Sequence, residues 1–431
     1  MAALTKETLP LNADDARQLI TDMAVAARAS QLEIGQTDAD MRNNALREAA
    51  RRIRNAKADI IAANQRDIAR GQSAGLNDAF IDRLTLNDER IEAMASGAEA
   101  IAILDDPLGV ELARWSQPNG LDITRISTAL GVIGIIYESR PNVTVDAASL
   151  CIKSGNACIL RGGSDSQDTS YLLAGLMREG LKAAGLAVDA VQMIPTPDRQ
   201  AVGALLAASG QIDVIIPRGG KGLVGRVQEE ARVPVFSHLE GICHIYISPA
   251  ANPKKAVEIA VNAKMRRVGI CGAAETILIH KDVVNTIGRD ITTALIKTGC
   301  EVRGAAEISA LHPDVKLANE TDWGCEFLAP IIAIKSVENM GEATSHIQQF
   351  GSGHTESILS EDKTEQEAFF ASVDSAIVMA NASTQFADGG EFGMGAEIGI
   401  ATGRLHARGP VGANQLTSFK YIVRGHGQTR P

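Results

Sequence analysis

The residue with the clearest chemical potential is Cys271, which stands in a loop bordered by glycines, with Arg266 and Arg267 just upstream. A thiolate is the reactive form of cysteine, and nearby cations stabilise it. Small neighbours leave the sulfur open to an electrophile. The apolar run at residues 276–280 predicts a buried strand that anchors the loop. These features favour a nucleophilic cysteine, with a buried structural cysteine as the alternative.

Two expected strands each end in an arginine that is followed by small residues, and we call each of these strand-to-loop junctions a corner. In a parallel sheet, ligands bind outside the carboxyl ends of the strands. Backbone N–H groups and an arginine at such an end suit a phosphate group. These corners therefore predict a phosphorylated cofactor, although each arginine could instead close a helix end or pair with a carboxylate such as Asp165. The corners comprise Arg161, Gly162, Gly163 and Ser164, and Arg218, Gly219 and Gly220.

The second corner continues into a literal G-x-G-x-x-G at residues 220–225, which follows a strand and opens a helix, with Glu240 further along. This pattern is typical of dinucleotide binding. The chain holds 40 glycines, so one match is weak evidence. A glycine-rich turn is the alternative. We expect nucleotide contact near this turn, but not in the usual fingerprint geometry.

Three further polar residues, Ser139, Arg140 and Asn142, follow the expected strand at residues 132–137. They could hold a substrate anion or stabilise an oxyanion. They could equally be turn and cap residues, which Pro141 favours.

The sequence shows no clear metal-binding pattern. His346 and His354 stand apart across the end of an expected helix, without convergent carboxylates or cysteines. We expect these histidines to be structural or to line the substrate site, and we expect no metal. Glu326 precedes a buried strand and alone indicates little.

Composition narrows the class of protein. The 431 residues carry a net charge of −10 and only 3% aromatic residues, which argues against a nucleic-acid binder. The six cysteines are scattered, with no C-x-x-C pair, so they suggest neither a zinc site nor disulfides. No apolar run approaches the roughly 20 residues that span a bilayer. We expect a cytoplasmic protein without a signal peptide or membrane contact.

Strand and helix patterns alternate along most of the chain, which predicts α/β domains with doubly wound parallel sheets. Helices occupy the region from about residue 13 to residue 104. Residues 112–127 read as a β-hairpin around Pro118, Asn119 and Gly120. The tail at residues 415–423 alternates weakly and predicts a strand beside that hairpin. The other expected strands are residues 132–137, 157–160, 191–194, 214–216, 233–236, 329–335 and 375–379; the expected helices are 143–153, 168–184, 199–208, 222–230, 251–264, 283–298 and 339–350.

Taken together, the chain resembles the gamma-glutamyl phosphate reductases (glutamate-5-semialdehyde dehydrogenases), a family of the aldehyde dehydrogenase superfamily. The resemblance covers nearly the whole chain and is more specific than any single motif. It is carried by residues 137–144, 160–164, 216–220, 241–246, 262–264, 274–276, 346–358, 386–397 and 405–412, and by Cys271.

This resemblance implies an aldehyde dehydrogenase-like fold with two Rossmann-like domains. It implies a cofactor domain at residues 1–109 and 132–250, a catalytic domain at 251–404, and an oligomerisation element at 110–131 and 405–431. It also implies that Cys271 becomes acylated. Arg161 takes the place of a lysine that contacts the adenosine ribose in the superfamily, and Glu326 the place of a glutamate near the nicotinamide ribose.

The implied reaction is NADPH-dependent reduction of L-glutamyl 5-phosphate to L-glutamate 5-semialdehyde and inorganic phosphate, through a cysteine thioester, in proline biosynthesis. Asn142 is the candidate for the superfamily's oxyanion asparagine. Ser139, Arg140, Arg266 and Arg267 are candidates for binding the substrate anions. The resemblance also implies a homo-oligomer and allows a docked glutamate 5-kinase.

Some positions depart from the family pattern. Arg266-Arg267-Val268 replaces a common Gln-Arg-Pro, and Gly272 replaces the asparagine that often follows the cysteine. Near the C-terminus, residues 412–415 read Gly-Ala-Asn-Gln where Gly-Leu-Glu-Gly is common. An acylating dehydrogenase for another acyl donor, and a catalytically silent dinucleotide-binding scaffold, are the alternatives. A single fast-reacting cysteine would argue against the scaffold.

Overall fold

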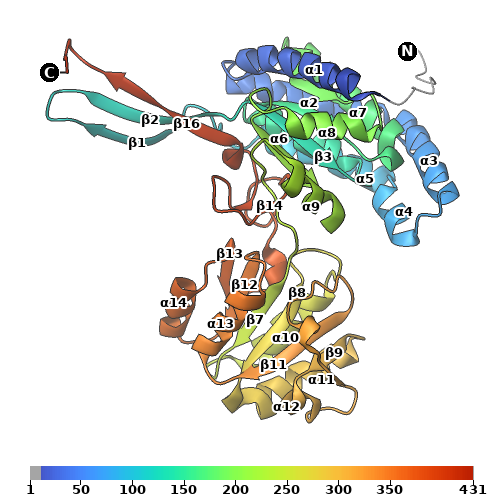
Figure 1. Cartoon of the computed structure of the whole chain (residues 1–431), viewed down its shortest axis with the longest axis vertical. Coiled ribbons are helices and arrows are strands. Elements are labelled where there is room, and N and C mark those ends of the chain that lie inside the picture. The colour runs from blue at the N-terminus through green and yellow to red at the C-terminus, as the bar shows by residue number, and fades with distance from the viewer. Residues whose placement is uncertain (1–10, 431) are drawn as a thin grey trace. The chain divides into compact units, whose positions relative to one another are not determined.

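The computed structural model describes residues 11–430, which form two compact units (Figure 1). Unit 1 comprises residues 11–237, Gly393–Gly399 and residues 411–430. Unit 2 comprises His238–Phe392 and Ile400–Pro410. Within residues 11–430, no helix has both the length and the apolar character needed to cross a membrane.

Unit 1 opens with five helices whose starts follow from the sequence. Asn12, Asn77 and Asn87 cap three of them by accepting hydrogen bonds from backbone N–H groups of the first turn. The helices expected between residues 13 and 104 are therefore confirmed. The helices are α1 (Ala13–Ile34), α2 (Ala39–Asn55), α3 (Lys57–Ser73), α4 (Asp78–Leu84) and α5 (Asp88–Ala102).

The centre of unit 1 is a four-stranded parallel sheet in the order β5-β4-β3-β6. Its strands are β3 (Val132–Tyr137), β4 (Ala157–Arg161), β5 (Val191–Met193) and β6 (Val214–Arg218). They alternate with α6 (Asn142–Lys153), α7 (Gln167–Ala183), α8 (Arg199–Ala207) and α9 (Lys221–Glu230). This alternation confirms the predicted doubly wound pattern, and the corners at Arg161 and Arg218 lie at the carboxyl edge of the sheet.

One predicted strand of this unit, residues 233–236, is wrong. The run makes only an isolated bridge, between Val235 and Ile215 of β6. Pro234 interrupts it, because proline has no N–H to donate to a strand ladder.

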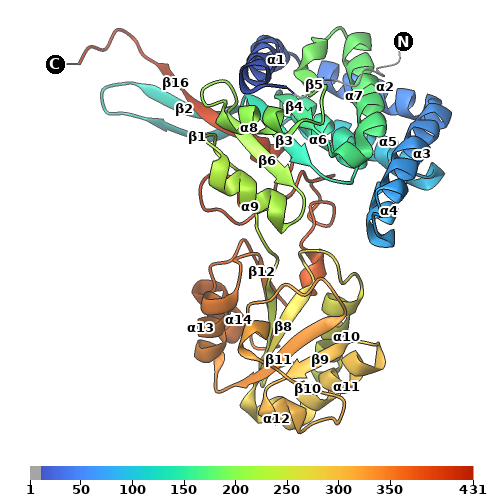
Figure 2. The ribbon, with the colours of Figure 1, turned by 45° about the vertical axis from the view of Figure 1, so that its right-hand side comes forward.

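The predicted hairpin and its third strand are confirmed. β1 (Glu111–Ser116) pairs with β2 (Asp122–Ala129), and β16 (Thr417–Arg424) pairs with the other side of β2, all antiparallel. Gly120 has a φ of 88°, which the tight turn requires and which glycine adopts without strain. Figure 2 shows the three strands side by side. Both outer strands carry exposed apolar side chains, among them Trp115, Phe419, Tyr421 and Val423.

Unit 2 is built on a seven-stranded parallel sheet in the order β10-β9-β11-β8-β7-β12-β13. Side chains alternate between its faces, so Ile245 and Ile277 pack on one face and Tyr246 and Leu278 on the other. The strands are β7 (Cys243–Ile247), β8 (Ala274–His280), β9 (Glu301–Gly304), β10 (Lys316–Leu317), β11 (Ile331–Val337), β12 (Thr355–Leu359) and β13 (Ile377–Ala380).

Five α-helices join the strands of this sheet: α10 (Pro253–Met265), α11 (Arg289–Lys297), α12 (Ala306–Ser309), α13 (Met340–Phe350) and α14 (Lys363–Ser372). The predicted helix at 283–298 begins with a π-helical turn, Val284–Gly288. Two short strands, β14 (Ile400–Ala401) and β15 (Gly409–Pro410), pair with each other. Since β7 belongs to this second sheet, the units divide between Ser237 and His238, whereas the predicted range 132–250 assigned β7 to the first domain. The roles assigned to the domains stay predictions.

The packing of α2 against α7 gives a test of the fold. A Cβ on Gly180 of α7 would lie 2.7 Å from the Ala45 carbonyl oxygen and 2.8 Å from the Ala49 Cβ. We expect Gly180→Ala to destabilise the protein by about 1–3 kcal/mol, the usual cost of overpacking. Gly175→Ala on the same helix meets nothing within 4 Å and should gain roughly 0.5–1 kcal/mol from reduced chain entropy. Denaturant midpoints of the two variants measure this, and equal stabilisation would show that the two helices can separate freely.

Candidate active site

Cys271 lies in a turn directly before β8. The N–H of Ala273 donates to the carbonyl of Ile270 at 3.0 Å and closes the turn. The residue is half-buried. It packs against a small apolar cluster made by Ile377, Ala387 and Ile400. The predicted strand after the loop is confirmed, so the thiol stands on a turn anchored to the middle of the sheet.

The segments around Cys271 all come from the amino edge of the unit 2 sheet. Strands β8, β7 and β12 are neighbours in a parallel sheet, so the residues that precede them meet at one edge. These are Cys271 before β8, Gly241 and Ile242 before β7, and His354 before β12. The site therefore lies at the edge opposite to the one where ligands usually bind in parallel sheets.

Gly241 touches the backbone of the nucleophile candidate. A Cβ at this position would lie 2.1 Å from the Cys271 carbonyl oxygen and 2.6 Å from its Cα. Only glycine fits there. The N–H of Gly241 donates to Glu326 Oε1 at 2.8 Å, and the Cys243 thiol donates to the Cys271 carbonyl at 3.1 Å. Glu326 thus lies within unit 2 beside the cysteine loop, where the resemblance puts the nicotinamide end of the cofactor.

Two histidines converge on the thiol. Cys271 Sγ and one ring nitrogen each of His238 and His354 all lie within 4.8 Å of one another. The two rings are 5.0 Å apart and nearly perpendicular, at 77°. Burial, with a contribution from His238, lowers the pKa of His354 to about 3, so this imidazole is neutral at physiological pH.

The sequence had not indicated this pair. His238 belongs to no recognisable motif, and only the fold brings it to the loop. His354 and His346, considered together as possible ligands, do not act as a pair. The ring of His346 packs instead against His244, Trp323 and Phe350.

The arginines upstream of Cys271 follow the end of α10, and both are exposed. Arg266 Nη1 lies 3.4 Å from Gln385 Oε1, and the Gln385 amide donates to the carbonyls of Ala263 and Arg267 at 2.9 and 3.2 Å. Gln385 therefore holds the backbone of this segment, a role that no sequence signal marked.

A buried ion pair ties the two ends of the cysteine loop together. Lys264, near the end of α10, pairs with Glu275 on β8, and both side chains are fully buried. Burial raises the pKa of Glu275 to about 7, while Lys264 acts in the opposite direction. The carboxylate also lies 3.5 Å from the N–H of Leu328, on the segment that carries Glu326.

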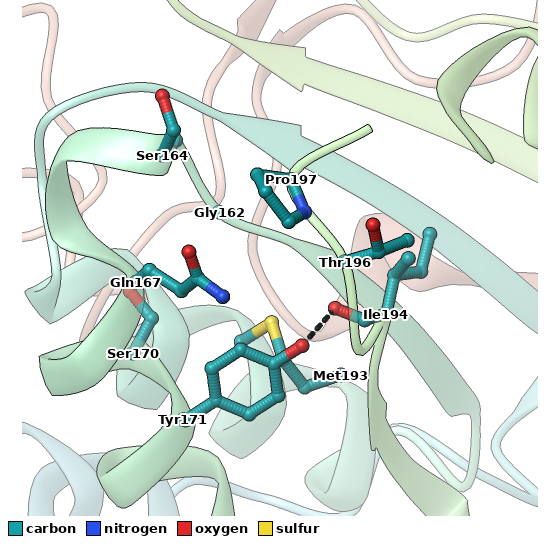
Figure 3. A pocket seen from close by; sticks show the side chains of 10 residues that line it. Gly162, Ser164, Gln167, Ser170, Tyr171, Met193, Ile194, Thr196 and Pro197 are labelled. Atoms are coloured by element: carbon teal, nitrogen blue, oxygen red, sulfur yellow. Dashed lines mark hydrogen bonds between the residues drawn. The ribbon is translucent and has the colours of Figure 1, made fainter. Parts of the chain in front are cut away.

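In unit 1, the corner after β4 borders a small hollow, bounded also by the end of β5 and the start of α7 (Figure 3). The Arg161 guanidinium donates to the carbonyls of Gly162 and Pro197, both at 2.8 Å. Burial lowers the pKa of this arginine, which marks a partly desolvated cation. An arginine beside a concave, glycine-lined strand end fits one end of a nicotinamide dinucleotide. The lining comprises Gly162, Gly163, Ser164, Gln167, Ser170, Tyr171, Met193, Ile194, Thr196 and Pro197.

The second corner is different, because a carboxylate occupies it. Gly220 N–H, at the start of α9, donates to Glu138 Oε2 at 3.0 Å, and a Cβ on Gly219 would lie 2.5 Å from that oxygen. A helix N-terminus that already holds an anion is not free for a pyrophosphate. The Arg218 side chain runs along Gly399, where a Cβ would lie 3.2 Å from Arg218 Cδ.

Beyond the carboxyl end of β3, Ser139 has a positive φ of 44° and donates its hydroxyl to Asp165. Asn142 is the first residue of α6, and its amide donates to Asp146 at 2.9 Å. Arg140 is exposed at the same turn. These residues belong to unit 1 and Cys271 to unit 2, so the proposed joint action of Asn142 and Cys271 stays a prediction.

Comparison with known proteins identifies the family. The aldehyde dehydrogenase family model matches residues 4–319. The chain is 55% identical over 419 residues to gamma-glutamyl phosphate reductase of Mesorhizobium japonicum, covering 97% of this chain and 98% of that protein. It is 54% identical over 413 residues to the protein of the same name from a Caulobacter species, covering 96% and 99%.

The chain belongs to the gamma-glutamyl phosphate reductase family. The crystal structure of gamma-glutamyl phosphate reductase from Thermotoga maritima agrees, with a TM-score of 0.93 at 40% identity over 96% of this chain and all of that one. The predicted aldehyde dehydrogenase-like α/β fold is confirmed. Membership of this superfamily makes the chain an oxidoreductase of the nicotinamide-dependent class.

The contact between Gly241 and Cys271 predicts a sharp mutational effect. Gly241→Ala must push the cysteine backbone aside, and a displacement of about 1 Å at a reacting group can cost roughly 100-fold in rate. We expect that loss in turnover, together with slower alkylation of Cys271 by iodoacetamide. Gly269→Ala, in the same loop, meets nothing within 4 Å and should behave like the wild type. Normal turnover in Gly241→Ala would show that the contact does not position the nucleophile.

Proposed function

We propose that the chain catalyses the NADPH-dependent reduction of L-glutamyl 5-phosphate to L-glutamate 5-semialdehyde and phosphate, a step of cytoplasmic proline biosynthesis. The observation that carries the proposal is the half-buried Cys271 on a turn fixed by Gly241 and flanked by imidazoles and arginines. The high identity to gamma-glutamyl phosphate reductases supports the choice of substrate.

The chemistry at Cys271 begins with the loss of the thiol proton. His238 Nδ1 lies 2.6 Å from the carbonyl oxygen of Ile400, and a carbonyl only accepts, so Nδ1 donates and Nε2 carries the lone pair. Nε2 can then take the proton. His354 is a poor base near neutral pH because burial lowers its pKa to about 3.

The thiolate then attacks the acyl carbon of the substrate, and a tetrahedral oxyanion forms. Backbone N–H groups near Cys271, with Asn142, are our candidates for stabilising its charge. Phosphate leaves and a thioester on Cys271 remains. When bound, the nicotinamide cofactor supplies the hydride that reduces the thioester carbon. The cysteine sulfur is released as a thiolate when the semialdehyde departs.

The substrate carries a carboxylate and a phosphate, which need cations. The exposed Arg266 and Arg267 border the cysteine loop. Arg140 and Ser139 are our further candidates for holding these anions. We assign Glu240 to structure or to the substrate ammonium, and Glu326 to the nicotinamide ribose, because Glu326 reaches Gly241 beside the thiol.

Phosphate dependence tests the reaction directly. In the oxidative direction, a thioester forms and a nucleophile must resolve it. If phosphate is that nucleophile, oxidation of glutamate 5-semialdehyde by NADP⁺ without phosphate should stop near one hydride per active site. The measurement is the rise of reduced cofactor with and without phosphate, at matched ionic strength because salt screens charges. Cys271→Ala is the control and should give no burst.

Sustained turnover in phosphate-free buffer would contradict the reductase assignment, because water would then resolve the thioester. The imidazole of His238 near the thiol makes this outcome a real test, since an imidazole in that place could activate water.

The cofactor preference has its own test. We expect Arg161, beside the hollow of unit 1, to meet the 2′-phosphate of NADPH, with Arg218 as the other candidate. A hydrogen bond to a charged group contributes roughly 1.5–3 kcal/mol, so Arg161→Gln should weaken NADPH binding about 10- to 100-fold and spare NADH. Arg218→Gln is the matched variant. Equal losses for both cofactors would assign the arginine to the shared pyrophosphate or to structure.

We further propose that the sheet formed by β1, β2 and β16 joins copies of the chain. Exposed strand edges with apolar side chains are a liability unless they are paired. Light scattering at micromolar concentration should find an oligomer for the wild type. The double variant Tyr421→Lys with Val423→Lys places charges on strand β16 at the edge of this sheet. It should shift the oligomer to smaller species. Val25→Lys, at an exposed position of α1, is the control. A fully active wild-type monomer would overturn this proposal.

A further inference from the structure

The amino edge of the unit 2 sheet gathers three soft or borderline metal ligands. The Sγ of Cys271 and one ring nitrogen each of His238 and His354 lie within 4.8 Å of one another. Around a tetrahedral zinc, bond lengths of about 2.3 Å to sulfur and 2.0–2.1 Å to nitrogen put donor atoms roughly 3.3–3.6 Å apart. Side-chain movements of about 1 Å would therefore bring these three donors into a zinc coordination shell.

Each group can present the electron pair that a metal needs. His238 uses Nδ1 to donate to the Ile400 carbonyl at 2.6 Å, which leaves Nε2 as its acceptor nitrogen. A backbone contact of this kind also orients a metal-binding imidazole.

Of the three residues, His354 gives the strongest indication of a ligand at this site. Its side chain is fully buried, its Nδ1 lies 2.8 Å from the Thr355 hydroxyl, and its Nε2 has no hydrogen-bond partner among residues 11–430. Buried polar atoms are normally paired, so an orphaned imidazole nitrogen calls for an explanation.

We infer that Cys271, His238 and His354 form an inhibitory site for a zinc-class divalent ion. The Cys271 thiol gives its proton to solvent as the metal–sulfur bond forms, and water or a small anion takes the fourth position. The two imidazoles bind as neutral ligands. A metal-bound sulfur cannot attack an acyl carbon, so the ion and the acyl substrate exclude each other. The inhibition rests on the proposed role of Cys271 as nucleophile, whereas binding of the ion does not.

Cobalt(II) tests binding without any assay of turnover, because a thiolate ligand gives an intense charge-transfer absorption. Titration of the metal-free full-length chain with Co²⁺ should give this band at one ion per chain, and Zn²⁺ should displace it. Cys271→Ala should abolish the band. Cys325→Ala removes a different half-buried cysteine of unit 2 and should keep it.

The thiol of Cys243 is another sulfur that could bind the ion in place of Cys271. Cys243 Sγ lies 3.7 Å from His354 Nδ1. If Cys243→Ala loses the band and Cys271→Ala keeps it, the ion has another sulfur ligand and the proposed site is wrong. The absence of any band in the wild type also overturns it.

The histidines are tested by affinity. His238→Gln and His354→Ala should each weaken Co²⁺ binding at least about 10-fold, because even groups outside a coordination shell change affinity roughly 10- to 100-fold when removed. His238→Gln keeps the inference testable if the buried His354 proves necessary for folding. Unchanged affinity in a folded His238→Gln variant contradicts the three-ligand site.

Protection of Cys271 from alkylation tests whether binding of Zn²⁺ affects catalysis. Zn²⁺ should slow alkylation of Cys271 by iodoacetamide and inhibit the reductase, and a chelator should reverse both effects. Rising concentrations of acyl phosphate should relieve the inhibition competitively. If Zn²⁺ blocks alkylation but leaves turnover unchanged, the metal site stands and the proposed catalytic role of Cys271 fails. If Zn²⁺ inhibits without protecting Cys271, this site is not the cause.

Discussion

The buried ion pair between Lys264 and Glu275 is the constraint on which the active-site loop depends. It joins the end of α10 to β8, and the loop between them carries Arg266, Arg267 and Cys271. Removing one partner of such a pair typically costs about 3–5 kcal/mol, because the other charge stays buried without compensation. Burial raises the pKa of Glu275 to about 7 even though Lys264 acts in the opposite direction, so the lysine favours the charged form of a carboxylate that burial disfavours. The buried pair therefore influences both the geometry of the Cys271 loop and the charge of Glu275. It does so from inside the protein, where direct contact with the substrate is not needed.

The two units use opposite edges of their sheets, and this changes how each can hold an anion. In unit 1, the corner at Arg161 lies at carboxyl strand ends, where the following helices begin and their N-termini favour negative charge. In unit 2, Cys271 lies at amino strand ends, and the loop follows the C-terminus of α10. A helix C-terminus carries partial negative charge, so the acyl phosphate that we propose as substrate would need side-chain cations there. Arg266 and Arg267 border this loop and are our candidates for that role.

Much of this arrangement could be predicted from the sequence where local patterns are strong. Continuous apolar runs predicted β3 and β8, and alternating residues predicted the three-stranded sheet. The predicted strand at residues 233–236 was wrong because the single residue Pro234 outweighs the apolar pattern of this run. The histidine site could not be predicted because His238 and His354 precede different strands and meet only through the strand order β8-β7-β12. Similarly, nothing local shows that Glu138 fills the turn at Gly220.

The neutrality of His354 bears on how the cysteine is kept from wasteful hydrolysis. A protonated imidazole beside a thiol would hold it permanently as a thiolate, but burial lowers the pKa of His354 to about 3 and rules out that role near neutral pH. The same low basicity makes His354 a poor activator of water against a thioester. His238 donates from Nδ1 to the Ile400 carbonyl, so Nε2 is the acceptor nitrogen to which our proposed mechanism assigns the thiol proton. In the proposed reaction, a weakly basic His354 and arginines that attract an incoming phosphate would favour exchange of the acyl group between sulfur and phosphate over its transfer to water.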